Sequence, residues 1–221
     1  MIRIRIENVV ASTSLGDEFD LRSIALTLDG AEYEPTQFPG LIYRLKEPRT
    51  AILLFHSGKV VCTGGKSRKQ VEDAIRIVSA EIRKSGQKVI ERPKIQVQNI
   101  VATSNLGSQI DLTSVAVAFG LDRVEYEPEQ FPGLVFRLDE PRVVMLLFGS
   151  GKLVCTGALR PSDVDVAVRK VMKELQTAGA LPQARAPAPP ETPRTPRTSR
   201  ASASGGIPPR QEAPPLIGDS P

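Results

Sequence analysis

The chain has 221 residues, of which 40% are hydrophobic, 24% charged and 5% aromatic, and its 29 basic and 25 acidic residues leave a net charge of +4. This mild positive excess permits an anionic partner without requiring one, and no apolar run approaches the ~20 residues of a membrane span. There is no signal-peptide pattern, so we expect an intracellular protein. Two Cys and one His are too few for a disulfide scaffold or a structural zinc site, so we expect no metal or cofactor.

The first ninety residues are predicted to contain both strands and helices. Residues 2–11 alternate apolar and polar side chains, as a strand does. A short helix is expected near 20–28, and a longer one between Ser67, which forms a capping-box pattern with Gln70, and Gly86. Three β-rich runs separated by turn residues predict an antiparallel meander between these helices: 41–46, 51–55 and 59–63.

The same unit occurs a second time. Residues 33–67 match residues 126–160 at 23 of 35 positions, without a gap. Asn8 and Asn99 begin matching segments upstream at a smaller offset, so the second copy contains two additional residues before Tyr126. The helices are expected to recur in the second copy at equivalent positions: near 111–119 and from Ser162 to Gly179.

A repeat of ~90 residues is too long for a solenoid unit. We therefore predict two pseudo-symmetric α+β halves, residues 1–90 and 91–181. Residues 182–221 contain 11 of the 19 prolines and no aromatic residue, so this Pro/Arg-rich tail is predicted to be disordered. It is interpreted as a solvated appendage, or alternatively as weak electrostatic help in holding a polyanion.

Strand alternation divides the predicted sheet into two faces. One face is wholly apolar and should pack against the helices. It includes Cys62 and Cys155, which we expect to be buried thiols and not nucleophiles. The other face mixes Val and Leu with amides, hydroxyls and cations, and an exposed surface of this kind usually marks a binding site.

Catalysis has little support in the sequence. The only His, His56, has Gly149 at its repeat position, and it is interpreted as a solvated loop residue. There is no GxGxxG or GxxxxGK[ST] motif. We therefore expect a protein that is not an enzyme, since an enzyme domain predicts a pocket with convergent titratable groups.

Four Phe lie at turn ends, where cores taper. Packing at the edge of the core is the common fate of a Phe, whereas exposed Phe pairs at both ends of a sheet are suited to wedging between stacked bases. The four residues are Phe38, Phe55, Phe131 and Phe148.

The segment Glu-Pro-x-Gln-Phe-Pro-Gly-Leu, present at 34–41 and again at 127–134, resembles the TATA-box-binding protein family in its archaeal form. The resemblance extends over residues 1–181. It implies a saddle in which two tandem repeats form a ten-stranded antiparallel sheet, with four helices on the convex face. It also implies a general transcription initiation factor that binds the minor groove of A·T-rich TATA-box promoter DNA, kinks it, and recruits transcription factor B and RNA polymerase.

The resemblance assigns roles to individual residues. The residues expected to enter base steps are Phe38, Phe55, Phe131 and Phe148. Those expected to contact bases are Asn8, Val10, Leu53, Val61, Thr63, Asn99, Val101, Leu146, Val154 and Thr156. Those expected to contact phosphates are Arg44, Ser57, Lys59, Arg137, Ser150 and Lys152. Those expected to bind transcription factor B are Glu127, Glu129 and Gln130.

The alternative from another class is a sheet-face module that binds single-stranded RNA by stacking. Such platforms carry aromatic residues in mid-strand, whereas here they flank the sheet ends. As a DNA-binding factor the protein is expected in the cytoplasm at the nucleoid, as a monomer on DNA, and its apolar face is compatible with self-association when free. Glu7, whose repeat partner is Gln98, would hinder phosphate approach if it faced DNA.

Overall fold

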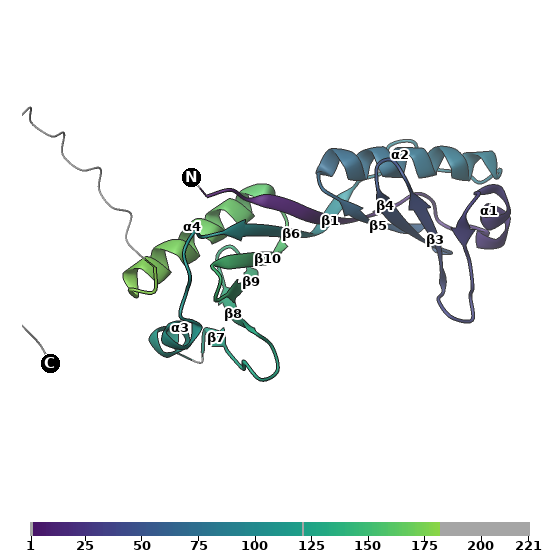
Figure 1. The fold of residues 1–221 in the computed structure, drawn as a ribbon. Coiled ribbons are helices and arrows are strands. Elements are labelled where there is room, and N and C mark those ends of the chain that lie inside the picture. Colours follow the sequence, from purple (N-terminus) through teal and green to yellow (C-terminus); the bar gives the residue numbers. More distant parts are fainter. Residues whose placement is uncertain (1, 121, 182–221) are drawn as a thin grey trace, which may run out of the picture. The chain divides into compact units, whose positions relative to one another are not determined.

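The computed structural model describes residues 2–120 and 122–181, which contain one ten-stranded antiparallel sheet and four α-helices (Figure 1). The first repeat forms β1 (Arg5–Ser14), α1 (Leu21–Thr27), β2 (Ala31–Glu32), β3 (Gly40–Leu45), β4 (Thr50–Phe55), β5 (Lys59–Gly65) and α2 (Arg68–Lys84). The second forms β6 (Gln96–Asn105), α3 (Leu112–Phe119), β7 (Val124–Glu125), β8 (Gly133–Leu138), β9 (Val143–Phe148), β10 (Lys152–Ala158) and α4 (Pro161–Thr177). The predicted disorder of 182–221 lies outside the described residues.

The sheet is symmetric about its two central strands. The strand order is β2-β3-β4-β5-β1-β6-β10-β9-β8-β7, so each repeat contributes five consecutive strands. The repeats meet where β1 pairs with β6, in a register that places Val9 opposite Ile100. The two halves therefore form one continuous surface and not two separate sheets.

The first strand is displaced from its prediction. It runs from Arg5 to Ser14, not over 2–11, because its pairing with β5 extends to Ser14 opposite Lys59. The capping prediction for α2 is confirmed in part. The Ser67 hydroxyl accepts from the Gln70 N–H at 3.2 Å, but the Gln70 side chain accepts from the Lys66 N–H and not from that of Ser67.

The helices of the second repeat also differ from expectation. Helix α4 begins at Pro161, one residue before Ser162, because proline has no N–H to lose and its fixed φ suits the first helical position. Helix α3 is one residue longer than α1 and ends before Gly120, at φ 74°. The inserted residues thus lengthen the segment formed by α3 and its connection to β7, as the two repeat offsets predicted.

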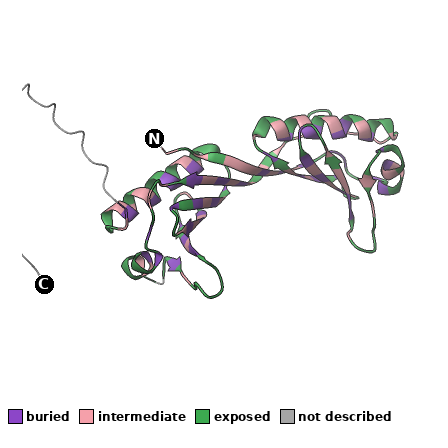
Figure 2. Cartoon of the chain, viewed as in Figure 1, coloured by how far each residue is buried: buried purple, intermediate pink, exposed green. Residues whose placement is uncertain are grey.

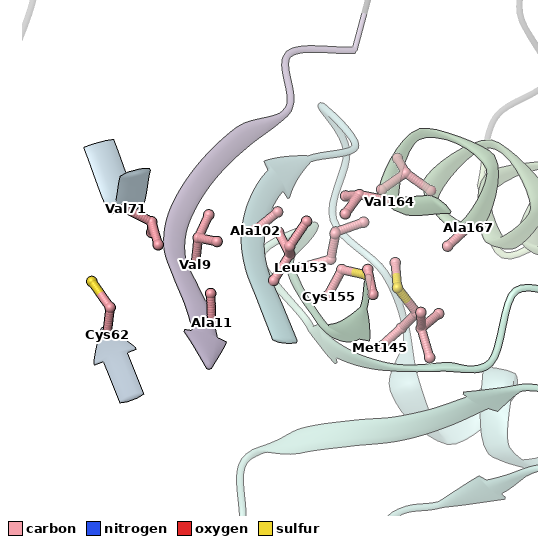
Figure 3. Close-up of a cluster of buried hydrophobic side chains, with 14 of the residues drawn as sticks. Val9, Ala11, Cys62, Val71, Ala102, Met145, Leu153, Cys155, Val164 and Ala167 are labelled. Carbon is pink, nitrogen blue, oxygen red and sulfur yellow. The ribbon is translucent and has the colours of Figure 1, made fainter. Parts of the chain in front are cut away.

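The core lies between the sheet and the helices, and burial alternates as predicted along β4, β5, β9 and β10 (Figure 2). Figure 3 shows strand residues such as Val9 and Cys62 gathered with Val71 of α2, and Cys155 with Val164 of α4 in the other half. Both cysteines are fully buried, and burial raises the pKa of each thiol to about 11. They are therefore protonated packing residues at neutral pH.

Among the described residues, no helix combines the length and apolarity that crossing a membrane requires. Within the same ranges, no group of three or more His, Cys, Asp or Glu side chains is arranged to hold a metal ion.

Candidate nucleic-acid interface

The sheet face turned away from the core is not covered by any described helix, and its side chains are half-buried by one another. We call it the open face. Its first-repeat members are Asn8, Val10, Ser12, Ile42, Ala51, Leu53, Val61 and Thr63. Its second-repeat members are Asn99, Val101, Thr103, Val135, Val144, Leu146, Val154 and Thr156.

An apolar row crosses three strands in each half of the open face. Ile42 pairs in register with Leu53, and Leu53 with Val61. The equivalent row of the second repeat is Val135, Leu146 and Val154. Sequence reasoning named the two inner residues of each row but missed Ile42 and Val135. The register of β3 against β4 would have identified them, because it places side chains of one face directly opposite each other.

Polar groups lie near the centre of the open face and their orientation is fixed. The Gly64 N–H donates to Asn8 Oδ1 at 2.7 Å, and Asn8 Nδ2 lies 3.3 Å from the Thr63 hydroxyl. A backbone N–H can bond only the oxygen of an amide, so Nδ2 carries the NH₂ group; one of its two hydrogens is donated to Thr63 and the other remains as a donor. Asn99, Thr156 and Gly157 repeat this arrangement with the same two distances.

A pair of Phe rings stands at each end of the open face. Phe38 and Phe55 are 5.8 Å apart between centroids and meet edge to face at 63°. Phe131 and Phe148 are 5.9 Å apart at 67°, and Phe131 is 39% exposed. The structure shows packing at the edge of the core, since the rings pack on each other and none is fully buried; wedging between bases stays a prediction.

A glycine makes room for each ring pair. A Cβ at Gly40 would lie 2.7 Å from the Phe38 ring and 3.2 Å from the Phe55 ring. A Cβ at Gly133 would lie 2.6 Å and 3.0 Å from the equivalent rings. Any side chain at these two positions would push the rings apart.

The turn after each strand-end Phe is held by the backbone. In the first repeat, the Leu15 N–H donates to the Gly58 carbonyl at 2.9 Å, and the Phe19 N–H donates to the His56 carbonyl at 2.8 Å. Gly58 has φ 73°, and a Cβ there would collide with the Gly16 carbonyl. The second repeat makes the same bonds from Leu106 to Gly151 and from Ile110 to Gly149.

These turns present Ser57, Lys59, Ser150 and Lys152, whereas Arg44 lies on β3 and Arg137 on β8; all six side chains predicted to contact phosphates are exposed. Two of them are not free. Arg44 lies 3.7 Å from the Glu32 carboxylate and Arg137 lies 2.9 Å from the Glu125 carboxylate. A phosphate would therefore compete with a carboxylate at both arginines.

Glu7 gives the open face an asymmetry. Its carboxylate accepts from the Thr103 hydroxyl at 3.0 Å and lies 3.5 Å from Arg5 and 3.4 Å from Lys66. The Thr103 hydrogen bond and the two cations lower the pKa of Glu7, so it stays ionised. Its repeat partner, Gln98, instead donates to the Ser12 hydroxyl at 2.8 Å.

His56 is more constrained than a solvated loop residue. Its Nδ1 lies 2.7 Å from the Phe19 carbonyl oxygen and its Nε2 lies 3.0 Å from the Glu18 carboxylate, although the side chain is 66% exposed. The ring ties the turn after Phe55 to the segment that follows β1.

The connections between β2 and β3 and between β7 and β8 extend as exposed loops (Figure 1). In the second loop the N–H groups of Gln130 and Phe131 both donate to the Glu127 carbonyl, and Glu127, Glu129 and Gln130 are all exposed. The three residues predicted to bind transcription factor B thus lie together and accessible, apart from the open face.

Comparisons with known proteins agree with this architecture. The family model described as "Transcription factor TFIID (or TATA-binding protein, TBP)" matches residues 3–85 and 94–178. A TATA-box-binding protein of Thermoplasma acidophilum is 58% identical over 179 residues, which are 81% of this chain and 97% of the relative. TATA-box-binding protein E of Halobacterium salinarum is 54% identical over 178 residues, covering 80% of this chain and 96% of the relative.

A solved structure agrees as well. The Methanococcus jannaschii TBP superposes with a TM-score of 0.74 at 49% identity, over 79% of this chain and 99% of that protein. The predicted fold class, an α+β saddle of two tandem repeats with ten strands and four helices, is confirmed. The chain belongs to the TATA-binding protein family, whose members are DNA-binding general transcription initiation factors and not enzymes.

Proposed function

We propose that the chain binds the minor groove of A·T-rich TATA-box promoter DNA with the open face, kinks it with the two Phe pairs, and recruits transcription factor B and RNA polymerase. The observation that carries this proposal is the combination of oriented amide donors at the centre of the open face with a Phe pair at each end. The names of the relatives support the choice of the TATA box.

The chemistry of the open face favours A·T pairs. In the minor groove both A·T and T·A present only acceptors, at A N3 and T O2, whereas G·C adds the N2 amino donor. Asn8 and Asn99 can each donate one further amide N–H, because their oxygens accept from glycine N–H groups and only one hydrogen of each NH₂ is donated to a threonine. The apolar rows would leave a guanine amino group without an acceptor, and an unsatisfied buried donor costs about 1–3 kcal/mol.

The Phe pairs are suited to kinking. Apolar side chains inserted at a base step partly unstack it and bend the duplex, a mechanism for which the TATA-box-binding proteins are themselves a standard example. Each pair is already packed and supported by a glycine, so insertion needs little rearrangement of the protein. Flexible TA steps cost the least to deform, which adds sequence preference without base contacts.

Transcription factor B is proposed to bind the acidic loop at Glu127, Glu129 and Gln130. RNA polymerase would then be recruited by the bound transcription factor B. The first-repeat loop has Thr36 where the second has Glu129, and the Thr36 hydroxyl donates to Glu34 at 2.8 Å. This difference favours the second loop for a basic partner. We also propose that the protein is nucleoid-associated and monomeric on DNA, and that it can self-associate through the open face when free.

The test is energy transfer across a short duplex labelled at both ends, with a G·C-substituted duplex as the comparison. We expect binding and bending of the A·T duplex only. The double variant Phe131→Ala/Phe148→Ala should lose most of the bend. Leu26→Ala removes an apolar side chain that is 91% exposed on α1, and it should change nothing.

Equal binding to both duplexes without bending would contradict the proposal. Tighter binding to single-stranded RNA than to the A·T duplex would favour a stacking module instead. For the partner, a gel-shift assay with transcription factor B should show loss of the ternary complex in Glu127→Arg/Glu129→Arg but not in Glu34→Arg, which changes the equivalent residue of the first loop.

A further inference from the structure

A cationic strip borders the open face beside the second-repeat Phe pair, and one of its members comes from the first repeat. Lys152 pairs in register with Asn105 on the neighbouring strand β6. Arg3 is held beside this pair, because the hydroxyl of Ser104, the residue next to Asn105, donates to the Arg3 carbonyl at 3.0 Å. Arg3, Asn105, Lys152 and Phe148 line one open cavity of about 950 Å³.

An equivalent cationic strip lies in the first-repeat half, where the cation from the other repeat comes from the second repeat. Lys59 pairs in register with Ser14, and the Thr13 hydroxyl donates to the Lys94 carbonyl at 3.0 Å. Lys94 occupies the repeat position of Arg3, at the offset of 91 that relates Asn8 to Asn99. Each strip therefore contains one cation from its own repeat and one from the other repeat.

The four strip cations differ from their neighbours in having no acidic partner. Within residues 2–120 and 122–181, no carboxylate lies within ion-pair distance of them, whereas the nearby Arg5 is paired with Glu7 at 3.5 Å. Arg44 and Arg137 are also paired with carboxylates. The four unpaired cations are Arg3, Lys59, Lys94 and Lys152. An unpaired exposed cation can contact a phosphate without giving up another bond, and it releases a condensed counterion when it does so.

We propose that Arg3 and Lys94 bind phosphates of double-stranded DNA, so that each edge of the minor groove is held by cations from both repeats. The inference rests on the proposed function, because it places the duplex against the open face. Arg5 is excluded from this role by its pairing with Glu7, and its repeat partner Gln96 carries no charge.

The test measures the salt dependence of binding, using the full chain with the A·T and the G·C duplexes between 50 and 300 mM salt. Each phosphate contact contributes about 0.9 to the slope of log K against log salt. Arg3→Ala and Lys94→Ala should each lower the slope by about 1 and weaken binding roughly threefold to tenfold at 0.1 M salt, equally on both duplexes. The double variant should lower the slope by about 2.

Two controls separate charge from structure. Arg3→Lys should keep the wild-type slope, and Lys69→Ala, which removes an exposed cation from α2 on the helix side, should also keep it. Unchanged slopes in both Arg3→Ala and Lys94→Ala, with wild-type melting temperatures, would overturn the inference. That outcome is distinct from failure of the proposed function, which is recognised by the wild-type chain showing no preference for the A·T duplex.

Discussion

In the first-repeat half of the open face, the Phe rings are 5.8 Å apart and the central Asn oxygen accepts from a glycine N–H at 2.7 Å. In the second-repeat half the same separations are 5.9 Å and 2.7 Å. The halves differ in charge. Residues 1–90 carry 14 basic and 11 acidic side chains and residues 91–181 carry 10 and 11, and the ionised Glu7 of one half is matched by the neutral Gln98 of the other.

This comparison separates two kinds of requirement. The backbone and the side chains bonded to it have the same geometry in both halves, as the proposed function requires, since each half would then contact an equivalent end of a duplex. The rim and the loops are free to differ because solvent screens their charges. An asymmetric complex on a nearly symmetric surface must therefore obtain its asymmetry from the rim, the loops or the DNA sequence.

The largest effect is expected from the glycines that hold the turns. Gly58→Ala and Gly151→Ala each force a side chain into a left-handed conformation and against a carbonyl of the preceding loop. Each should lower the free energy of unfolding by about 3 kcal/mol in urea denaturation. Gly30→Ala, at φ 79° with open space around it, isolates the conformational cost and should lose only about 1 kcal/mol. A mild effect of Gly151→Ala alone would show that the two turns are not equivalent.

A smaller effect is expected from reversing the central donors. Asn8→Asp and Asn99→Asp keep the oxygen that accepts from glycine but replace the NH₂ group by an acceptor. Each should weaken binding to the A·T duplex roughly 5- to 150-fold, the range of about 1–3 kcal/mol for a direct base contact. Asn8→Asp should be the worse of the two because Glu7 adjoins it. Adding Glu7→Gln to Asn8→Asp should make its affinity for the A·T duplex, measured by fluorescence titration, equal to that of Asn99→Asp. Equal affinities of the two single variants would argue against a role for Glu7.

A pH dependence of stability is expected that both halves should share. Burial raises the pKa of each cysteine from 9.0 to about 11. Below pH 9 the thiol is protonated in both the folded and unfolded chain, so its contribution to stability is fully present. As the pH rises from 9 to 11 the unfolded chain loses this proton first, and stability declines. Urea midpoints should show this decline. It should be reduced by about half in Cys62→Ala or Cys155→Ala, and an undiminished decline in the double variant would exclude the thiols as its source.

The sequence predicted the repeat and the faces of the strands, because both depend on spacing along the chain, and it placed the four Phe at turn ends; their role as wedges stays a prediction. It could not predict Ile42 and Val135 as part of the open face, since their neighbours belong to another strand and depend on register. The two-residue strands β2 and β7 are too short to show any period. The orientation of the Asn8 amide depends on a glycine N–H 56 positions away, which no local pattern encodes.

The strand order also fixes a length. Between β4 and β9, which carry Phe55 and Phe148, lie the strands β5, β1, β6 and β10, so five inter-strand spacings separate the two wedges. At ~4.8 Å per spacing this is roughly 24 Å, or about seven base-pair rises of ~3.4 Å. The outer edges of the sheet, β2 and β7, offer only two residues each to a further strand. Under the proposed function, the number of strands between the two Phe pairs sets the number of base pairs between the two kinks. Only a strand inserted between β4 and β9, and not a longer loop or helix, would change that number.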